Sequence, residues 1–140
     1  MKTVVLDASV VVKRFFEEAH SKAAEQGVAR ADERLAPDLI WAEAANVIWK
    51  RQHRGDLTAE AATDLAQHML ALPVVVHPSA DLVPDALDLA VRLERSVYGC
   101  LYLALAVRTA SALVTGDLRL VRALAGGPLG KHVAWIGKHR

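Results

Sequence analysis

The chain has 140 residues, of which 53% are hydrophobic and 24% are charged, and its formal net charge is +1. This composition indicates one globular domain, excludes a disordered chain, and argues against a protein that binds nucleic acid mainly through a large basic surface. The single cysteine, Cys100, excludes an intrachain disulfide, and no Cys/His spacing suggests a zinc site. No signal peptide is evident at the N-terminus, and the longest strongly apolar run is far below the ~20 residues of a membrane span. We therefore expect a soluble, cytoplasmic protein that does not associate with membranes.

The first half of the chain is predicted to hold one strand and four helices. Thr3–Leu6 is an apolar run without alternation, which is typical of a strand buried on both faces. Residues 35–37 are expected to form only a short extended link. Asp38 and Thr58 are residue types that cap helices at their N-termini. The predicted helices are residues 10–18, 21–31, 38–53 and 58–72.

The second half is predicted to alternate between strands and helices. Residues 74–77 are expected to form a second buried strand, followed by strands at 112–115 and 132–136. The helices are residues 82–95, with Pro84 in the first turn, then 99–109, which is apolar nearly all round and therefore buried, and finally 117 to about 126. Because strands alternate with helices, the sequence predicts a single three-layer α/β/α domain over residues 1–140 around a central, mostly parallel sheet.

Three acidic residues occupy positions that favour a ligand site. Asp7 directly follows the first strand, and Asp117 follows the strand at 112–115 by two residues. Ligands of open parallel sheets bind beyond the carboxyl ends of strands, although an aspartate there can instead simply cap the next helix. Glu43 shares a predicted helix face with Ile40 and Val47. A carboxylate in such an apolar stripe is costly unless a metal ion or a basic side chain pairs with it.

These carboxylates would suit Mg²⁺ or Mn²⁺, which prefer carboxylate and water oxygens. Such an ion can activate a water molecule and stabilise the charge that develops on a phosphodiester. The sequence has no phosphate-binding loop, no dinucleotide fingerprint and no Ser-His-Asp or Cys-His arrangement that would indicate another chemistry. A phosphoaspartate phosphatase would need a second aspartate two residues after Asp7, where this chain has Ser9.

Four blocks of the sequence resemble the successive motifs of VapC-type PIN domains. They are residues 4–9, Glu43 in the helix after Asp38, residues 98–106 and residues 115–117. Their order and spacing agree with this family over essentially the whole chain. The resemblance implies a PIN-like fold and an Mg²⁺- or Mn²⁺-dependent endoribonuclease. It also implies the toxin of a toxin–antitoxin pair, which cuts tRNA or rRNA, forms a homodimer or a larger assembly, and is neutralised by a VapB-type antitoxin.

By position in these motifs, Asp7, Glu43 and Asp117 are implied to be catalytic metal ligands, with Ser9 and Thr115 supporting them through hydrogen bonds. The family pattern has a further aspartate at the start of the buried helix, where it would both cap the helix and bind metal, and this chain has Gly99 there. Glycine at an N-cap costs little stability, but the metal site loses one carboxylate. We therefore expect an intact fold with sharply reduced or absent nuclease activity. The alternative is a non-catalytic PIN-fold module that binds RNA or an antitoxin.

Two further groups of side chains are candidates for binding. Arg119 and Arg122 lie in the first turns of the helix that Asp117 begins, where they could attract RNA phosphates. A second group recurs at helical spacing beside Glu43 and is either part of the core or the lining of a groove for an antitoxin helix. The residues of this second group are Trp41, Ile48 and Trp49.

Overall fold

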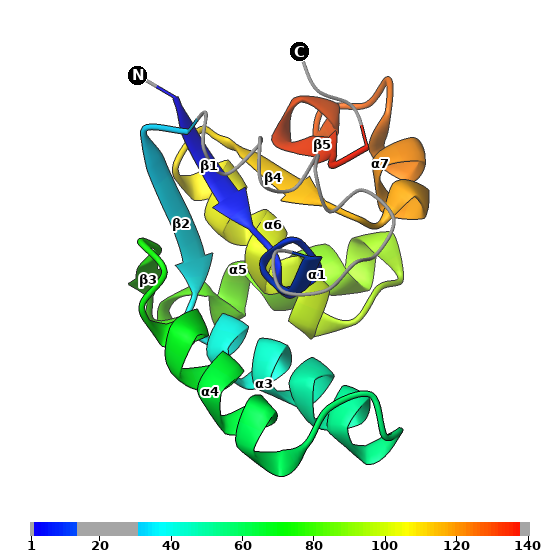
Figure 1. Cartoon of the computed structure of the whole chain (residues 1–140). Coiled ribbons are helices and arrows are strands. Elements are labelled where there is room, and N and C mark those ends of the chain that lie inside the picture. The colour runs from blue at the N-terminus through cyan, green and yellow to red at the C-terminus, as the bar shows by residue number, and fades with distance from the viewer. Residues whose placement is uncertain (1, 14–30, 138–140) are drawn as a thin grey trace.

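The computed structural model describes residues 2–13 and 31–137, which build a five-stranded parallel sheet in the order β3-β2-β1-β4-β5 (Figure 1). The strands are β1 (Thr3–Leu6), β2 (Glu33–Pro37), β3 (Val75–His77), β4 (Ala112–Thr115) and β5 (Val133–Trp135). Strand β1 pairs in parallel with β2 on one side and with β4 on the other. The strand order therefore reverses at β1, so the carboxyl ends of β1 and β4 lie at the point where such sheets bind ligands.

Helices cover both faces of this sheet, which confirms the predicted three-layer architecture. Helix α6 packs across β1, β2 and β4, and α5 packs against α6, whereas α1 lies on the opposite face (Figure 1). Helices α3 and α4 pack together at the carboxyl end of β2 (Figure 1). The helices are α1 (Ala8–Lys13), α3 (Leu39–His53), α4 (Ala59–Leu70), α5 (Ser79–Leu93), α6 (Val97–Arg108), α7 (Leu118–Leu124) and the short 3-10 helix η1 (Gly130–His132).

The core of the domain is centred on β1 and α6. Val4, Val5 and Leu6 are each at most 3% exposed, which confirms a strand buried on both faces. Residues 100–106 of α6 are all buried, as predicted for a helix that is apolar nearly all round. Full burial of one large aliphatic side chain contributes about 1.5–3 kcal/mol. The helix is thus firmly anchored, and its N-terminal turn has a fixed position relative to the end of β1.

Two strand predictions need correction. Residues 35–37 are not a link, because they belong to β2, which is paired on both sides with β1 and β3. The predicted buried strand at 74–77 is the exposed edge strand β3, in which Val75 is 54% exposed. Both errors have one cause. Whether these short segments pair as strands, and whether they are buried, depends on their position in the sheet, which their own residues do not indicate.

Helix boundaries or capping hydrogen bonds also differ from the predictions at three positions. Helix α5 begins at Ser79, which puts Pro84 in its second turn. Asp38 is the N-cap residue of α3, as predicted, but its side chain makes no capping hydrogen bond to α3. Its carboxylate instead accepts hydrogen bonds from the N–H and Oγ–H groups of Ser79, the first residue of α5. Ser96 is the N-cap of α6, so Gly99 is the third helical residue and not a cap.

Two predicted features fall partly or wholly outside the described residues. The structure does not describe residues 14–30. Almost all of the helix expected over 21–31 and the second half of the helix expected over 10–18 therefore lie outside the described residues. Among the residues that are described, no helix has the length and apolar character needed to cross a membrane.

Candidate active site

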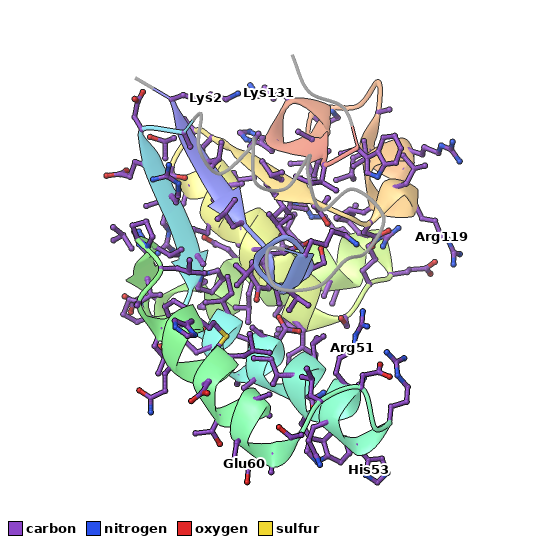
Figure 2. All side chains as sticks on the ribbon, in the orientation of Figure 1. Lys2, Arg51, His53, Glu60, Arg119 and Lys131 are labelled. Atoms are coloured by element: carbon purple, nitrogen blue, oxygen red, sulfur yellow. The ribbon has the colours of Figure 1, made fainter. Side chains whose placement is uncertain are left out.

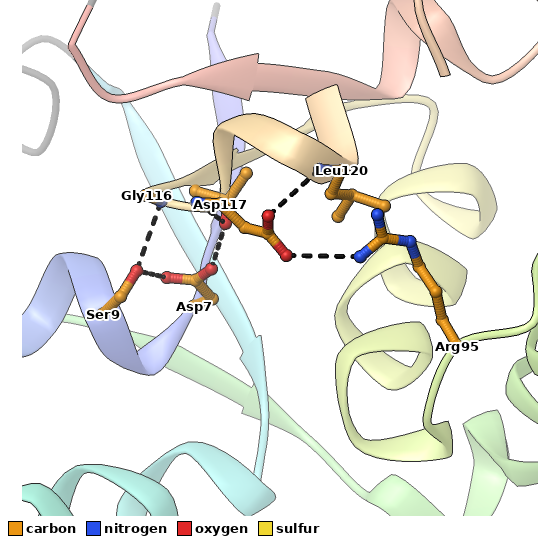
Figure 3. Close-up of polar contacts among 7 residues, drawn as sticks. Asp7, Ser9, Arg95, Gly116, Asp117 and Leu120 are labelled. Carbon is orange, nitrogen blue, oxygen red and sulfur yellow. Dashed lines mark hydrogen bonds and ion pairs between the residues drawn. The ribbon is translucent and has the colours of Figure 1, made fainter. Parts of the chain in front are cut away.

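Asp7 lies at the carboxyl end of β1, where the chain turns into α1. Its Oδ1 accepts hydrogen bonds from Ser9 Oγ at 2.5 Å and from the Val10 N–H at 3.2 Å, and its Oδ2 accepts one from Thr115 Oγ1 at 2.5 Å (Figure 3). Burial raises the pKa of this carboxyl, while the hydrogen bonds from Ser9, Thr115 and Val10 act in the opposite direction. The Asp7 carboxylate is therefore held rigidly, in surroundings where a nearby cation would stabilise its charge.

Asp117 lies two residues beyond β4, at the N-cap of α7. Its Oδ1 accepts a hydrogen bond from the Leu120 N–H at 3.0 Å, and its Oδ2 lies 3.4 Å from a guanidinium nitrogen of Arg95 (Figure 3). The Asp117 N–H donates to Thr115 Oγ1 at 3.1 Å. The Thr115 hydroxyl thus connects Asp117 to Asp7, because it accepts from one and donates to the other. Capping a helix and facing the site are therefore compatible roles for Asp117.

Ser9 makes a second connection of the same kind between the ends of β1 and β4. Its hydroxyl donates to Asp7 and accepts a hydrogen bond from the Gly116 N–H at 3.2 Å (Figure 3). The two supporting residues implied by the motifs thus lie where they fix both oxygens of the Asp7 carboxylate.

Glu43 enters the site from α3 and is held by a tyrosine of α6. Its Oε1 accepts a hydrogen bond from the Tyr102 hydroxyl at 2.6 Å, and the Tyr102 side chain is only 2% exposed. Burial, followed by the hydrogen bond and the negative charge of Glu43, raises the pKa of Tyr102 far above its usual value. Tyr102 therefore remains a hydrogen-bond donor at any physiological pH and orients the Glu43 carboxylate.

The three predicted carboxylates face a single pocket of about 230 Å³. Its lining includes Asp7, Ser9, Glu43, Gly99, Tyr102, Thr115 and Asp117. Within residues 2–13 and 31–137, however, no three carboxylate, imidazole or thiol side chains are grouped closely enough to hold a metal ion. The set of donors nevertheless fits Mg²⁺ or Mn²⁺, because Mg²⁺ usually binds through one or two carboxylates and retains several water ligands.

Gly99 lies in the first turn of α6 with open space in front of it. A Cβ atom built at this position meets no heavy atom within 4 Å, so the site has room for a larger side chain. A neighbouring pocket of about 300 Å³ is lined by Gly99 together with Arg95 and Asp117. The glycine therefore leaves open space between two pockets that share Gly99 and Asp117 in their linings.

Arg95 and Tyr102 are the two site residues that sequence reasoning missed. Arg95 follows α5 directly after Glu94, which turns the chain with a left-handed φ of 54°. The Arg95 side chain is 32% exposed and forms the ion pair with Asp117. No motif marks an isolated arginine after a helix. Tyr102 did carry a signal, since a phenol in an otherwise apolar buried helix must find a hydrogen-bond partner.

The predicted antitoxin-groove residues differ in their surroundings. Ile48 is 3% exposed and belongs to the core, and Trp41 is half-buried and packs against it. Trp49 is 53% exposed, and its ring stacks on His53 with a centroid separation of 5.2 Å. Core packing thus accounts for Ile48, whereas Trp49 presents an exposed aromatic surface.

The predicted phosphate-binding arginines are both exposed on α7. Figure 2 shows Arg119 extending outward from this helix. Arg119 lines a pocket of about 420 Å³ together with Glu94, Arg95 and Asp117. Arg122 is not among the described residues that line this pocket.

Comparison with known proteins agrees with this fold. The model of the PIN domain family matches residues 4–125. The chain is 33% identical over 119 residues to Ribonuclease VapC3 of Pyrobaculum aerophilum, an alignment that covers 84% of this chain and 91% of that protein.

Solved structures with a similar fold include two whose sequences are much more distant. VapBC2 from Rickettsia felis, bound to a DNA fragment from its promoter, aligns with a TM-score of 0.68 and 14% identity over 95% of this chain and 98% of that one. VapC20 from Mycobacterium tuberculosis, a toxin that cleaves the sarcin–ricin loop, aligns with a TM-score of 0.65 and 18% identity over 84% and 93%. These structures support the fold, while the family model and the curated relative show that the chain belongs to the PIN-domain family as a VapC-type member.

Proposed function

We propose that this chain is the toxin of a toxin–antitoxin pair, with an Mg²⁺- or Mn²⁺-dependent endoribonuclease site that Gly99 impairs. The observation that carries this proposal is the convergence of Asp7, Glu43 and Asp117, from three separate segments, on one pocket. The relative in Pyrobaculum aerophilum is named a ribonuclease, and the VapC20 neighbour is described as cleaving the sarcin–ricin loop. The first description favours RNA as the substrate, and the second favours a structured RNA, such as tRNA or rRNA.

The residues of the pocket have separable roles in this proposal. A divalent ion, when bound, would supply a water molecule of lowered pKa and would stabilise the charge on the phosphodiester. Asp7, Glu43 and Asp117 are the candidate ligands: one or two of them would bind the ion directly, and water molecules would complete its coordination. The hydroxyls of Ser9 and Thr115 fix both oxygens of Asp7, and outer hydrogen bonds of this kind tune ligand orientation in metal sites.

Two features weaken the site in this chain. Gly99 takes one negative charge out of the pocket wall, and Arg95 partly neutralises Asp117. Both changes lower the attraction of the pocket for a divalent cation. We therefore expect weak metal binding and slow or undetectable cleavage. The same two features favour the second candidate function, a PIN-fold module that binds RNA or an antitoxin without cutting.

The proposed partner is a VapB-type antitoxin, in a homodimer or larger assembly of the toxin. The support is indirect: VapBC2, which shares this fold, was solved as a toxin–antitoxin complex on DNA. On this chain the exposed ring of Trp49, next to the half-buried Trp41, is a candidate anchor for an antitoxin helix.

The decisive experiment restores the fourth carboxylate. The unaltered chain and Gly99→Asp are each incubated with total RNA in Mn²⁺, in Mg²⁺ and in EDTA, and new RNA ends are mapped. We expect discrete, EDTA-sensitive cuts from Gly99→Asp alone, and none from the double variant that also carries Asp7→Asn. If folded Gly99→Asp makes no cuts in either metal, the nuclease proposal is wrong and the binding module takes its place.

A further inference from the structure

We infer that Arg95 and Arg119 form a phosphate-binding subsite that holds RNA beside the proposed active site in the absence of a divalent ion. The inference deepens the proposed function and rests on it, because the ligand is the backbone of the same RNA. It assigns a role to Arg95, which the catalytic scheme does not use.

The placement of the two arginines is the first argument. Both line the pocket of about 420 Å³ at the start of α7, and Asp117 lines this pocket as well as the proposed catalytic pocket. A third pocket, lined by Arg95, Gly99 and Asp117, lies against both. The three pockets therefore adjoin one another through shared lining residues, so an RNA strand that enters the catalytic pocket would pass close to Arg95 and Arg119.

The donor groups of the arginines are the second argument. A guanidinium carries five N–H donors in a fork that matches phosphate oxygens. Among the described residues, the Arg95 guanidinium forms a hydrogen bond only with Asp117, through one nitrogen at 3.4 Å. Arg119 forms no ion pair with any residue in the described part of the chain. Both side chains thus keep donors for a phosphate.

The ion pair between Arg95 and Asp117 is weak enough to be exchanged. Its two side chains are 32% and 47% exposed, and pairs exposed to this degree contribute little to stability because solvent screens them. The Arg95 guanidinium can therefore turn from Asp117 to a phosphate without a large loss.

The charge balance of the subsite explains why Gly99 matters for it. Glu94 and Asp117 offset the two arginines, so the pocket lining is close to neutral. Gly99 lines the adjoining pocket with Arg95 and Asp117, so an aspartate at position 99 would place a negative charge next to the subsite and repel phosphate unless a cation were present. The glycine that weakens metal binding thus favours RNA binding without metal.

The test measures RNA binding by fluorescence anisotropy of a fluorescein-labelled RNA hairpin in EDTA over a range of salt concentrations. We expect Arg95→Gln and Arg119→Gln each to weaken binding several-fold. The slope of log K against log salt should become shallower by about 0.7–0.9 for each phosphate that the variant no longer neutralises. Arg92→Gln is the matched control, because Arg92 is exposed, is paired with Asp88 at 3.0 Å and lines a different pocket. It removes the same charge and should bind like the unaltered chain.

Gly99→Asp is a second test, because it should change RNA binding in EDTA and cleavage in Mn²⁺ in opposite directions. In EDTA it should bind the hairpin more weakly than the unaltered chain, although it is the variant expected to cleave RNA in Mn²⁺. The inference is overturned if the unaltered chain does not bind the hairpin in EDTA, or if Arg95→Gln and Arg119→Gln bind as tightly as Arg92→Gln. Failure of the proposed function appears separately, as the absence of Mn²⁺-dependent cuts by Gly99→Asp.

Discussion

Removing the Tyr102 hydroxyl tests whether this phenol positions Glu43 for function. In Tyr102→Phe the ring remains in the core, and the interaction removed is the 2.6 Å hydrogen bond to Glu43 Oε1. Hydrogen bonds to charged groups contribute about 1.5–3 kcal/mol. Glu43 is only half-buried, so water can replace the phenol and the loss of stability should be near the lower end, at about 1.5 kcal/mol. Urea unfolding should show a lower midpoint at an unchanged m-value.

The functional part of this prediction uses Gly99→Asp as the background, because this is the variant in which we expect cleavage. A Glu43 carboxylate released from Tyr102 samples several rotamers, so we expect cleavage in Mn²⁺ to fall by about 10–100-fold, as is usual when the outer support of a metal ligand is removed. Tyr98→Phe is the matched control, because Tyr98 lies on the same helix and is 62% exposed. If Tyr102→Phe matches Tyr98→Phe in both stability and cleavage rate, the positioning role of Tyr102 is refuted.

Two further predictions concern the stability of the fold. Hydrogen bonds from Ser79 lower the pKa of Asp38, so this carboxylate stabilises the fold above its unfolded-state pKa and ceases to do so as the pH falls through its lower folded-state value. Asp38→Asn should therefore cost at most about 0.5 kcal/mol in denaturation at neutral pH, because the carboxylate is exposed and solvent screens it, and almost nothing in strong acid; equal losses at both would contradict this. Leu103→Ala, in the centre of α6 where Leu103 is 1% exposed, should cost about 2–5 kcal/mol in urea unfolding, whereas Val107→Ala at a 41% exposed position should cost far less.

The sequence predicts burial correctly where a run of consecutive apolar residues indicates it. The apolar run of β1 and the fully apolar α6 could be recognised because each carries its signal over consecutive residues. Strand β2 carries no such signal, and the apolar run at 74–77 predicts a strand but not that β3 lies at the exposed edge of the sheet. Their residues become a sheet only through pairing with β1 and with each other, which depends on contacts between segments far apart in the chain.

The residues of the candidate site also divide into those that the sequence predicts and those that it does not. Asp7 and Asp117 were predictable because strand ends in a parallel sheet meet at one edge, and the structure connects these two residues through Thr115. Arg95 carries no signal in the sequence. The phenol of Tyr102 indicates that it needs a hydrogen-bond partner, but the sequence does not identify that partner, because Asp117 and Glu43 lie 22 and 59 residues away from Arg95 and Tyr102 respectively. Contacts between segments that are distant in the sequence bring these pairs together, and a local motif does not encode such contacts.

Gly99 is the position where the demands of the fold and of the site can be separated. The fold does not require glycine there, because its φ is not left-handed and a Cβ would meet no atom within 4 Å. A glycine inside a helix costs roughly 0.5–1 kcal/mol relative to alanine, so Gly99→Ala should stabilise the chain by about this amount. Gly99→Asp also adds a Cβ atom, which restricts the backbone in the same way, and it adds a carboxylate.

The difference between these two variants therefore isolates the charge at position 99. Ligand binding to the folded state raises its stability by mass action, so Mn²⁺ should raise the melting temperature of Gly99→Asp more than that of Gly99→Ala. Differential scanning fluorimetry over a Mn²⁺ titration measures this difference without any need for RNA or for catalysis. Equal shifts for the two variants would mean that position 99 does not contribute to a metal site, even though it lines the same pocket as Asp7 and Asp117.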